Sequence, residues 1–338
     1  MRRAPAELAR RVAALALCAA LGPACGDFDP PIPDRGPQPK PDFTLPFQGP
    51  GRIATVWEWG REEPFEQRAL VLNERGASRE LPVDSPWWIH WVSPSELSVT
   101  SNPRGDRPRR HQALVVDLDG RVRSVLSTDP DLENLAPSPD GRLFAHTRYT
   151  EKGTGALEIL KFDGTLSVVA RTRTELDSLR AASWSPDGSE LVASRLLVSP
   201  PEGGILVRMY RVSRDLREVT LLHDGPPGGP PERLGARPLW WGSDGIYAQI
   251  DSGLSRCDPA GGGCVAVWSP PSGFVVGGTP VGDGAALLLV ADDDPITSET
   301  RARELHRVDL ATGRAERLHR TPDGVFLTEI AWTAAPES

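Results

Sequence analysis

Residues 182–193 read ASWSPDGSELVA, and the architecture of the chain can be read outward from them. Pro186 presets φ at the first central position of a turn, and Asp187 followed by Gly188 supplies the left-handed residue that closes it. Apolar and β-branched residues stand on both sides, as two short strands require. The stretch therefore predicts a tight β-hairpin, with Trp184 at the end of its first strand.

The same unit recurs along the chain. Aspartates at the equivalent turn position, Asp140, Asp187, Asp244 and Asp283, are separated by 47, 57 and 39 residues. A further copy without this aspartate begins at Trp91. A second turn, such as Leu-Asp-Gly at 118–120 or Ala-Thr-Gly at 311–313, links the outer pair of apolar runs. Four short strands per unit, repeated at roughly 40–55 residues, are typical of the blades of a β-propeller.

The two ends of the chain predict how the ring closes. Residues 52–84 offer only three strands, and residues 326–334 (FLTEIAWTA) form an orphan innermost strand with Trp332 at the position of the motif tryptophan. Together they would complete one blade from both chain ends and remove the free edges. Five full units plus this shared blade predict an all-β fold: a six-bladed β-propeller with four-stranded blades.

The repeats resemble those of the TolB-like propeller family, whose blades carry a W-S-P-D-G-x-x-[LI]-[AV] core. Residues 184–188 match this core outright, 138–141 and 243–245 match it in part, and 93–96 and 282–284 are degenerate copies. The resemblance covers about 285 residues, from Arg52 onward. It implies six blades and protein partners in the periplasm. A Pro-rich segment stands where TolB has a separate N-terminal domain, so a Tol–Pal role is not expected.

Residues 1–24 predict an export signal. Four arginines precede an apolar run of ten residues, which has the length of a secretory signal and is too short to span a bilayer. Small residues then precede Cys25, which resembles a bacterial lipoprotein signal with Cys25 as the lipidated residue. The alternative is a plain secretory signal with an incidental cysteine. Gly26, rather than Asp, favours the outer membrane over the inner one. Residues 25–51 are rich in proline and predict a semi-rigid tether ahead of the propeller at 52–338.

The net charge and the absence of several sequence motifs argue against some classes of function. Without residues 1–24 the chain carries 34 basic and 45 acidic residues, a formal charge of −11. Such an acidic chain has no electrostatic footprint for nucleic acid or for an anionic lipid surface. The membrane contact that we expect is the N-terminal lipid anchor. The sequence has no Gly-x-Ser-x-Gly elbow, phosphate-binding glycine loop or His-Glu-x-x-His, and we expect no cofactor.

Cys257 and Cys264 enclose six residues rich in glycine and proline. Cross-strand positions of a hairpin bring two cysteines within the Cα distance that a disulfide needs. In an oxidising envelope compartment this pairing is the expected one. We therefore predict a disulfide, the alternative being a metal site for which no adjacent thiol or histidine is available.

Metal and enzyme hypotheses have little support in the sequence. The histidines are expected at different radii of the ring: His90 on an innermost strand, His146 on a second strand, His111 and His306 on third strands, and His223 and His319 on outermost strands. Imidazoles so spread cannot converge on one ion. Asp292, Asp293 and Asp294 form a weak calcium candidate whose alternative is a solvated loop. A metal-dependent lyase or hydrolase remains a third alternative.

Trp87, Trp88 and Trp91 crowd the start of the second blade, with Trp57 and Trp59 in the first. Exposed aromatics could stack on sugar rings or anchor a protein ligand, and core filling is the other interpretation. We interpret the chain as a non-enzymatic envelope lipoprotein that binds or scaffolds protein partners. Its variable loops would be 101–112, 199–204, 226–236 and 292–303. The alternative is a propeller that binds a glycan or another small ligand.

Overall fold

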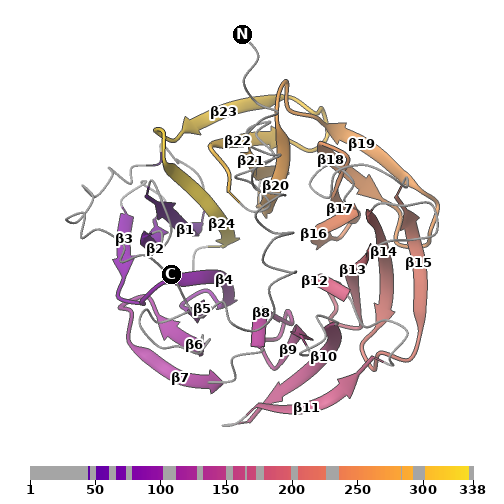
Figure 1. Cartoon of the computed structure of the whole chain (residues 1–338), viewed down its shortest axis with the longest axis horizontal. Coiled ribbons are helices and arrows are strands. Elements are labelled where there is room, and N and C mark those ends of the chain that lie inside the picture. The colour runs from indigo at the N-terminus through magenta and orange to yellow at the C-terminus, as the bar shows by residue number, and fades with distance from the viewer. Residues whose placement is uncertain are drawn as a thin grey trace, which may run out of the picture. The chain divides into compact units, whose positions relative to one another are not determined.

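Figure 1 shows the computed structural model of the chain. The structure describes residues 45, 51–60, 66–73, 78–101, 112–127, 132–149, 155–163, 166–172, 179–198, 205–225, 236–282, 284–291 and 301–334. Residues Met1–Lys40 and Pro41–Ser338 separate into two units, and all described residues belong to the second. Over these residues there are twenty-four strands and no α-helix. None of the described segments is therefore a helix of the length and apolarity needed to cross a bilayer.

The strands form six antiparallel sheets of four, which we number as blades in chain order. From the innermost to the outermost strand, blade 1 is β24 (Val325–Thr333), β1 (Arg52–Trp59), β2 (Glu66–Leu72) and β3 (Ser78–Leu81); blade 2 is β4 (Pro86–Ser93), β5 (Glu96–Ser101), β6 (Gln112–Asp117) and β7 (Val122–Ser127); blade 3 is β8 (Leu132–Pro137), β9 (Leu143–Tyr149), β10 (Gly155–Phe162) and β11 (Leu166–Arg171). In the same order, blade 4 is β12 (Leu179–Trp184), β13 (Glu190–Val198), β14 (Ile205–Ser213) and β15 (Val219–Asp224); blade 5 is β16 (Ala236–Gly242), β17 (Gly245–Ile250), β18 (Gly253–Cys257) and β19 (Cys264–Trp268); blade 6 is β20 (Phe274–Val281), β21 (Ala285–Ala291), β22 (Glu304–Asp309) and β23 (Ala315–Arg320).

The blades are arranged in a ring around one axis (Figure 1). Each innermost strand contacts the innermost strands of the blades before and after it, in the order β24, β4, β8, β12, β16 and β20. The outermost strands lie at the rim, where β7, β11, β15, β19 and β23 follow one another. The predicted all-β, six-bladed propeller is confirmed.

Blade 1 is built from both ends of the described chain. β1 pairs with β24 from Arg52↔Thr333 to Trp59↔Val325, with a bulge at Thr328. Trp332, the residue at the motif position, lies opposite Ile53. The predicted closure of the ring by N- and C-terminal strands that share a blade is therefore confirmed.

Similar bulges interrupt every innermost strand where it pairs with its second strand. Each bulge adds a residue to the inner strand, bends it and re-aims the side chains next to it. Away from the bulges, alternate residues of a strand point to opposite faces of the blade. In blade 3, for example, Ala145 packs toward Trp184 of blade 4, whereas Phe144 packs toward Ala113 of blade 2. The core consequently lies between the blades.

The Ser-Pro-Asp-Gly turns have a repeated hydrogen-bond pattern. In blade 4 the Ser185 hydroxyl donates to Asp187 Oδ1 over 2.6 Å and accepts from the amide of Glu190 over 3.0 Å. Hydrogen bonds from Ser185 and Ser189 lower the pKa of Asp187 to about 2. Gly188 closes the turn with φ +69°. The turn that begins at Ser138 in blade 3 repeats these contacts and lowers the pKa of its aspartate in the same way.

A third copy of this turn lacks both Pro and Gly. In the turn between β14 and β15, Ser213 donates to Asp215 over 2.7 Å and accepts from the amide of Glu218 over 2.9 Å. Leu216 takes the glycine position with φ +60° and is buried beside Val212. This copy has no Asp-Gly signature in the sequence, because its geometry rests on the serine and aspartate, and packing of the buried Leu216 holds that residue in the left-handed conformation.

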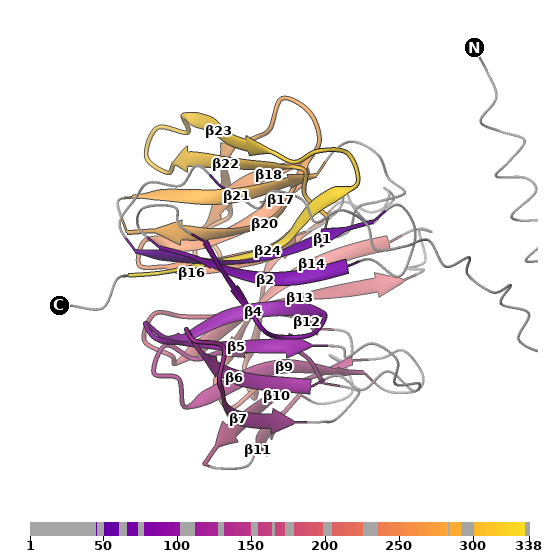
Figure 2. The ribbon, with the colours of Figure 1, turned by 90° about the vertical axis from the view of Figure 1, so that its left-hand side faces the viewer.

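Strand direction divides the connections between two faces of the propeller. The turn from the first to the second strand and the turn from the third to the fourth strand of each blade lie at one face, which we call the tight-turn face. The connections between second and third strands and between successive blades lie at the other face, the long-loop face (left and right in Figure 2). β1 begins and β24 ends at the tight-turn face, where the Arg52 guanidinium donates to the carbonyl of Pro94 in a hairpin turn.

Candidate functional site: the long-loop face

The long-loop face carries the greatest variation in connection length. The four segments predicted as variable loops (101–112, 199–204, 226–236 and 292–303) lie almost entirely outside the described residues. The strand ends that flank them, at β5/β6, β13/β14, β15/β16 and β21/β22, all belong to this face. At the tight-turn face, by contrast, most connections between described strands are turns of two to six residues. We therefore take the long-loop face as the candidate site.

The three tryptophans at the start of blade 2 differ in their surroundings. Trp87 lies at a bulge near the long-loop end of β4 and is 38% exposed. Trp88 is half-buried, and Trp91 donates from its indole to the carbonyl of Ala331 in blade 1 over 3.2 Å. The hydrogen bond of Trp91 thus links blade 2 to blade 1. Trp87 is the most exposed of the three tryptophans.

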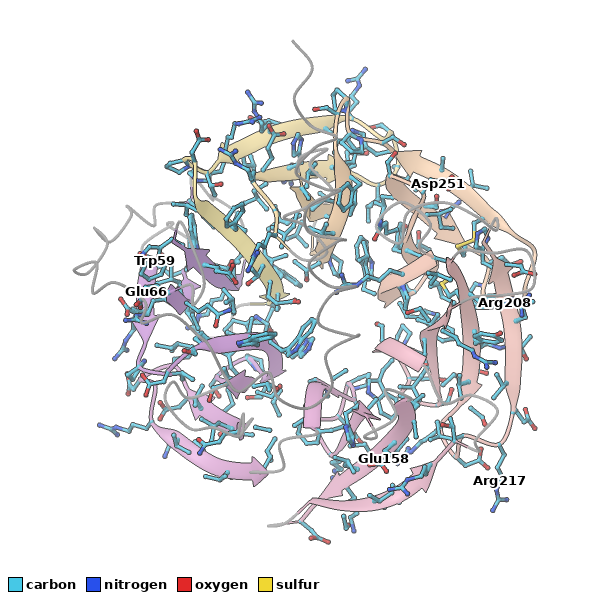
Figure 3. All side chains as sticks on the ribbon, viewed as in Figure 1. Trp59, Glu66, Glu158, Arg208, Arg217 and Asp251 are labelled. Atoms are coloured by element: carbon cyan, nitrogen blue, oxygen red, sulfur yellow. A yellow bond between two sulfur atoms is a disulfide. The ribbon has the colours of Figure 1, made fainter. Side chains whose placement is uncertain are left out.

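Trp57 and Trp59 of blade 1 are almost fully buried in the cluster between blades 1 and 6. Leu45, which precedes β1, contributes to the same cluster. At these two tryptophans the core-filling interpretation is the one that the structure supports. Figure 3 places Trp59 beside Glu66, within blade 1.

A buried polar contact braces the long-loop end of blade 1. Glu58 accepts a hydrogen bond from Gln67 over 3.1 Å and forms an ion pair with Arg301, the residue shortly before β22. The Arg301 guanidinium also lies 5.8 Å from the ring centre of Phe326. A carboxylate so buried requires these partners, and its role is to hold blades 1 and 6 together.

Arg237 and Glu329 are charged residues of innermost strands in neighbouring parts of the ring. Arg237 of β16 donates to the carbonyl of Val276 in β20 over 3.0 Å. Burial raises the pKa of Glu329 in β24 to about 8, and the charge of Arg237 opposes that shift. β20 lies between these two strands, but Gly277 and Gly278 bring no side chain to this stretch of it. Sequence reasoning missed this pair, although a lone charge within FLTEIAWTA was an available signal.

Blade 3 contains a second buried polar group. Glu158 lies between His146 and Arg171 across three strands, with His146 Nε2 2.9 Å from Glu158 Oε2 and Arg171 paired with the other oxygen. The side chains of His146 and Glu158 are fully buried. The row of three residues joins three strands of one sheet and ends at Arg171 on the outermost strand.

The described histidines are as dispersed as predicted. His90, His146, His306, His223 and His319 lie on β4, β9, β22, β15 and β23, while His111 lies outside the described residues. Within the part of the chain that the structure describes, no group of three histidine, cysteine, aspartate or glutamate residues is arranged to hold a metal ion. Asp292, Asp293 and Asp294, the weak calcium candidate, are outside that part, as is Cys25.

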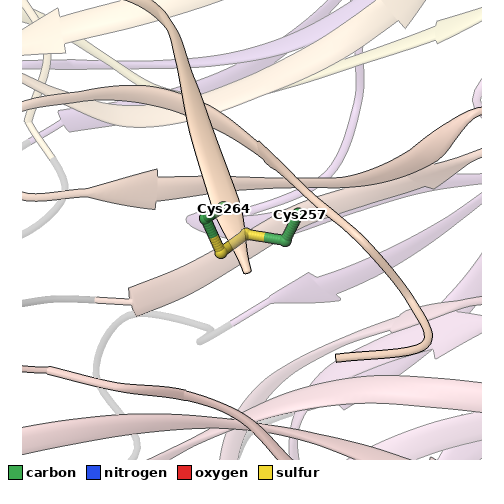
Figure 4. The surroundings of a disulfide bond; sticks show 2 residues. All are labelled: Cys257 and Cys264. Carbon is green, nitrogen blue, oxygen red and sulfur yellow. A yellow bond between two sulfur atoms is a disulfide. The ribbon is translucent and has the colours of Figure 1, made fainter. Parts of the chain in front are cut away.

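The predicted disulfide is present. Cys257 and Cys264 are directly opposite in β18 and β19, with their Cα atoms 3.9 Å apart, and their sulfurs are bonded (Figure 4). The turn that they enclose lies at the tight-turn face, where the carbonyl of Pro259 accepts a hydrogen bond from Arg211 of blade 4 over 3.0 Å. The disulfide therefore belongs to the framework and lies away from the candidate site.

Comparison with known proteins gives the fold. No protein-family model and no curated protein matches the chain. Among solved structures, TolB from Acinetobacter baumannii has a TM-score of 0.59 and 15% identity, over 83% of this chain and 66% of that one. A chain of a nidogen/laminin complex has a TM-score of 0.59 and 14% identity, over 84% and 99%. A candidate TolB from Agrobacterium tumefaciens has a TM-score of 0.53 and 17% identity, over 83% and 99%.

These similarities show that the chain has the six-bladed propeller fold found in TolB. It spans about two thirds of the length of Acinetobacter TolB and nearly all of the other two chains. At such low identity the shared feature is the framework of blades.

Proposed function

We propose that this protein is a non-enzymatic binding module of the cell envelope, and that its partner is a protein that contacts the long-loop face. The observation that carries the proposal is the asymmetry between the two faces. Rigid blades present one surface of short, similar turns and an opposite surface on which the connections differ in length and composition. Loops held on a rigid scaffold are where binding specificity is most often placed.

The proposal includes an anchor at the N-terminus. Residues 1–24 would be removed as a lipoprotein signal, Cys25 would carry the lipid, and residues 25–51 would form the tether. The signal would export the chain, and Gly26 after the cysteine favours the outer membrane over the inner one.

Photo-cross-linking in the native cells tests which face binds. p-Benzoylphenylalanine placed at Trp87 or Ser272 probes the long-loop face, and the same residue at Arg142 or Arg214 probes the tight-turn face; all four positions are exposed. We expect one envelope protein to be captured from the first pair and not from the second. Capture from the tight-turn positions alone would overturn the proposal. A Cys25→Ser chain tests separately whether capture requires the lipid anchor.

Glycan binding is the second candidate, and the exposed ring of Trp87 is the observation that favours it. A sugar stacked on this ring would change tryptophan fluorescence on titration with cell-wall or polysaccharide fragments. Trp87→Ala or Trp88→Ala would abolish that change. A response that persists in both variants would remove the tryptophans from the glycan hypothesis.

A further inference from the structure

A pocket opens at the long-loop face between the turn that joins β17 to β18 in blade 5 and the connection that leads from blade 5 to blade 6. Its volume is about 320 Å³, and it is lined by Asp251, Ser252, Pro270, Pro271, Ser272, Gly273 and Phe274. Asp251 and Ser252 form the turn between β17 and β18, and the other five residues lead from β19 into β20. Figure 3 places Asp251 in blade 5 near blade 6.

Both walls of the pocket are held firmly. Ile250 pairs with Gly253, so Asp251 and Ser252 make a two-residue hairpin turn in which Asp251 has φ +53°. The carbonyl of Asp251 accepts a hydrogen bond from Gln249 over 3.2 Å, and the carbonyl of Ser252 accepts one from the amide of Val275 over 3.0 Å. The second bond ties the turn to β20. Two consecutive prolines restrict the backbone of the opposite wall.

The lining combines one charge with apolar surface. Asp251 is the single charged residue among the seven, and it is exposed. Its carboxylate has no hydrogen-bond or ion-pair partner among the residues that the structure describes. The pyrrolidine rings of Pro270 and Pro271 supply apolar surface, and Ser252 and Ser272 add two hydroxyls.

The residues that line the pocket exclude some classes of ligand and favour one. Phe274 is only 3% exposed, so the pocket offers no open aromatic face on which a sugar ring could stack. One carboxylate supplies too few ligands for a metal ion. A lysine or arginine side chain fits both features, because its methylene stem packs on apolar surface while its charged end meets a carboxylate. The net charge of −11 that the chain has without residues 1–24 also attracts a basic partner.

We propose that the pocket between Asp251 and Pro270–Pro271 receives a lysine or arginine side chain of the protein partner. The inference rests on the proposed function, since it names the chemistry by which the long-loop face recognises its partner. The basic side chain lies along Pro270 and Pro271, and its cation pairs with Asp251. Ser252 and Ser272 accept its remaining hydrogen bonds.

Short peptides test the pocket without the partner. Acetyl-Gly-Arg-Gly-amide and acetyl-Gly-Lys-Gly-amide are titrated into the full chain and followed by NMR, with the Gln and Glu peptides for comparison. We expect millimolar binding of the two basic peptides, weakened by salt, and at least fivefold weaker binding to Asp251→Asn. Asparagine tolerates the left-handed conformation, so this variant keeps the turn. Asp84→Asn, an exposed acid of the same face outside the pocket, is the matched control.

The proposal is overturned if the Gln peptide binds as well as the Arg peptide, or if Asp251→Asn and Asp84→Asn behave alike. Capture of the partner in cells separates this inference from the proposed function. If Asp251→Asn leaves capture from position 87 unchanged, the pocket proposal fails while the binding face stands. If no partner is captured from either long-loop position, the proposed function fails and the peptide titration still decides the chemistry of the pocket.

Discussion

The two faces of the propeller differ in how they connect the strands. Among the described turns of the tight-turn face, one arrangement appears three times: a serine hydroxyl donates to the aspartate two residues later and accepts from the amide five residues later. At the long-loop face, connections range from the two-residue turn at Asp251 to segments of ten residues or more. The repeated face specifies the fold, and the varied face is free to specify a ligand. This explains why a motif that identifies the fold says little about function.

The largest effect is expected at the tight-turn face. Trp184→Ala should lower the free energy of unfolding by about 3–5 kcal/mol, because Trp184 is buried between blades 3 and 4. Trp184→Phe keeps most of the ring and loses the 3.0 Å hydrogen bond to the carbonyl of Ala136, for a loss of about 1 kcal/mol. Urea denaturation measures both. A loss below 1 kcal/mol for Trp184→Ala would contradict the view that packing of Trp184 between the blades stabilises the fold.

Glu329, between the two faces, should make stability depend on pH. Its folded pKa of about 8 exceeds the ordinary 4.5, so its contribution is complete below pH 4.5 and is lost as the pH rises through 8. Glu329→Gln lacks this loss. The variant should match the natural chain at pH 4.5 and exceed it by several kcal/mol at pH 9, since each pH unit between the two pKa values is worth about 1.4 kcal/mol. Equal stabilities at pH 9 would contradict the burial of this carboxyl group. Arg237→Gln should enlarge the difference, because it removes the opposing charge.

A glycine of the repeated turn allows a finer comparison. Gly188→Ala should lower the free energy of unfolding by about 1 kcal/mol, because alanine resists φ +69°. The new Cβ would have room, since its nearest neighbour would be Pro139 Cδ at 3.6 Å. Gly188→Asn is the control and should lose less, because asparagine tolerates this conformation. Equal losses in thermal or urea unfolding would mean that the side chain, and not the backbone, determines the effect.

Acid should weaken the same turn. The pKa of Asp187 is lowered from 3.8 to about 2, so its contribution to stability is present above pH 3.8 and is lost as the pH falls through 2. Asp187→Asn should therefore be less stable than the natural chain at pH 5, with a difference that shrinks toward pH 2. Unfolding curves at pH 5, 3.5 and 2 measure it. A difference that does not change with pH would assign the effect to hydrogen bonding alone.

The smallest effect on stability is expected at the long-loop face. Trp87→Ala should lower the free energy of unfolding by about 1 kcal/mol or less, because Trp87 is 38% exposed and lies at a bulge. It should nevertheless reduce capture of the partner severalfold in the cross-linking experiment from Ser272. Trp91→Ala is the contrasting variant, since its indole joins blades 1 and 2 and its loss should destabilise the fold. A stability loss at Trp87 as large as that at Trp91 would erase the distinction between the two faces.

The framework could be predicted because its determinants are local. The Ser-Pro-Asp-Gly motif predicts the turn, and the spacing of its copies predicts the number of blades. The unpaired C-terminal strand with Trp332 predicts how the ring closes. The copy at Ser213 was missed because Leu216 occupies a position where glycine is expected. The relation of Arg237 to Glu329 and the pocket at Asp251 arise from strands or connections brought together by the ring. The spacing of residues within one blade does not predict which residues of other strands or connections will lie beside them.

Closure of the ring also has a consequence for how the protein is made. Thr55 of β1 hydrogen-bonds to the carbonyl of Glu329 in β24, a residue 274 positions later. At 5–20 residues per second, synthesis of that interval takes roughly 15–55 s, during which β1 has no inner neighbour. A chain that terminates before β24 keeps this edge open and its apolar residues exposed. Pairing with β24 thus covers the inner edge of β1, which stays open to other strands until residues 325–333 have been made.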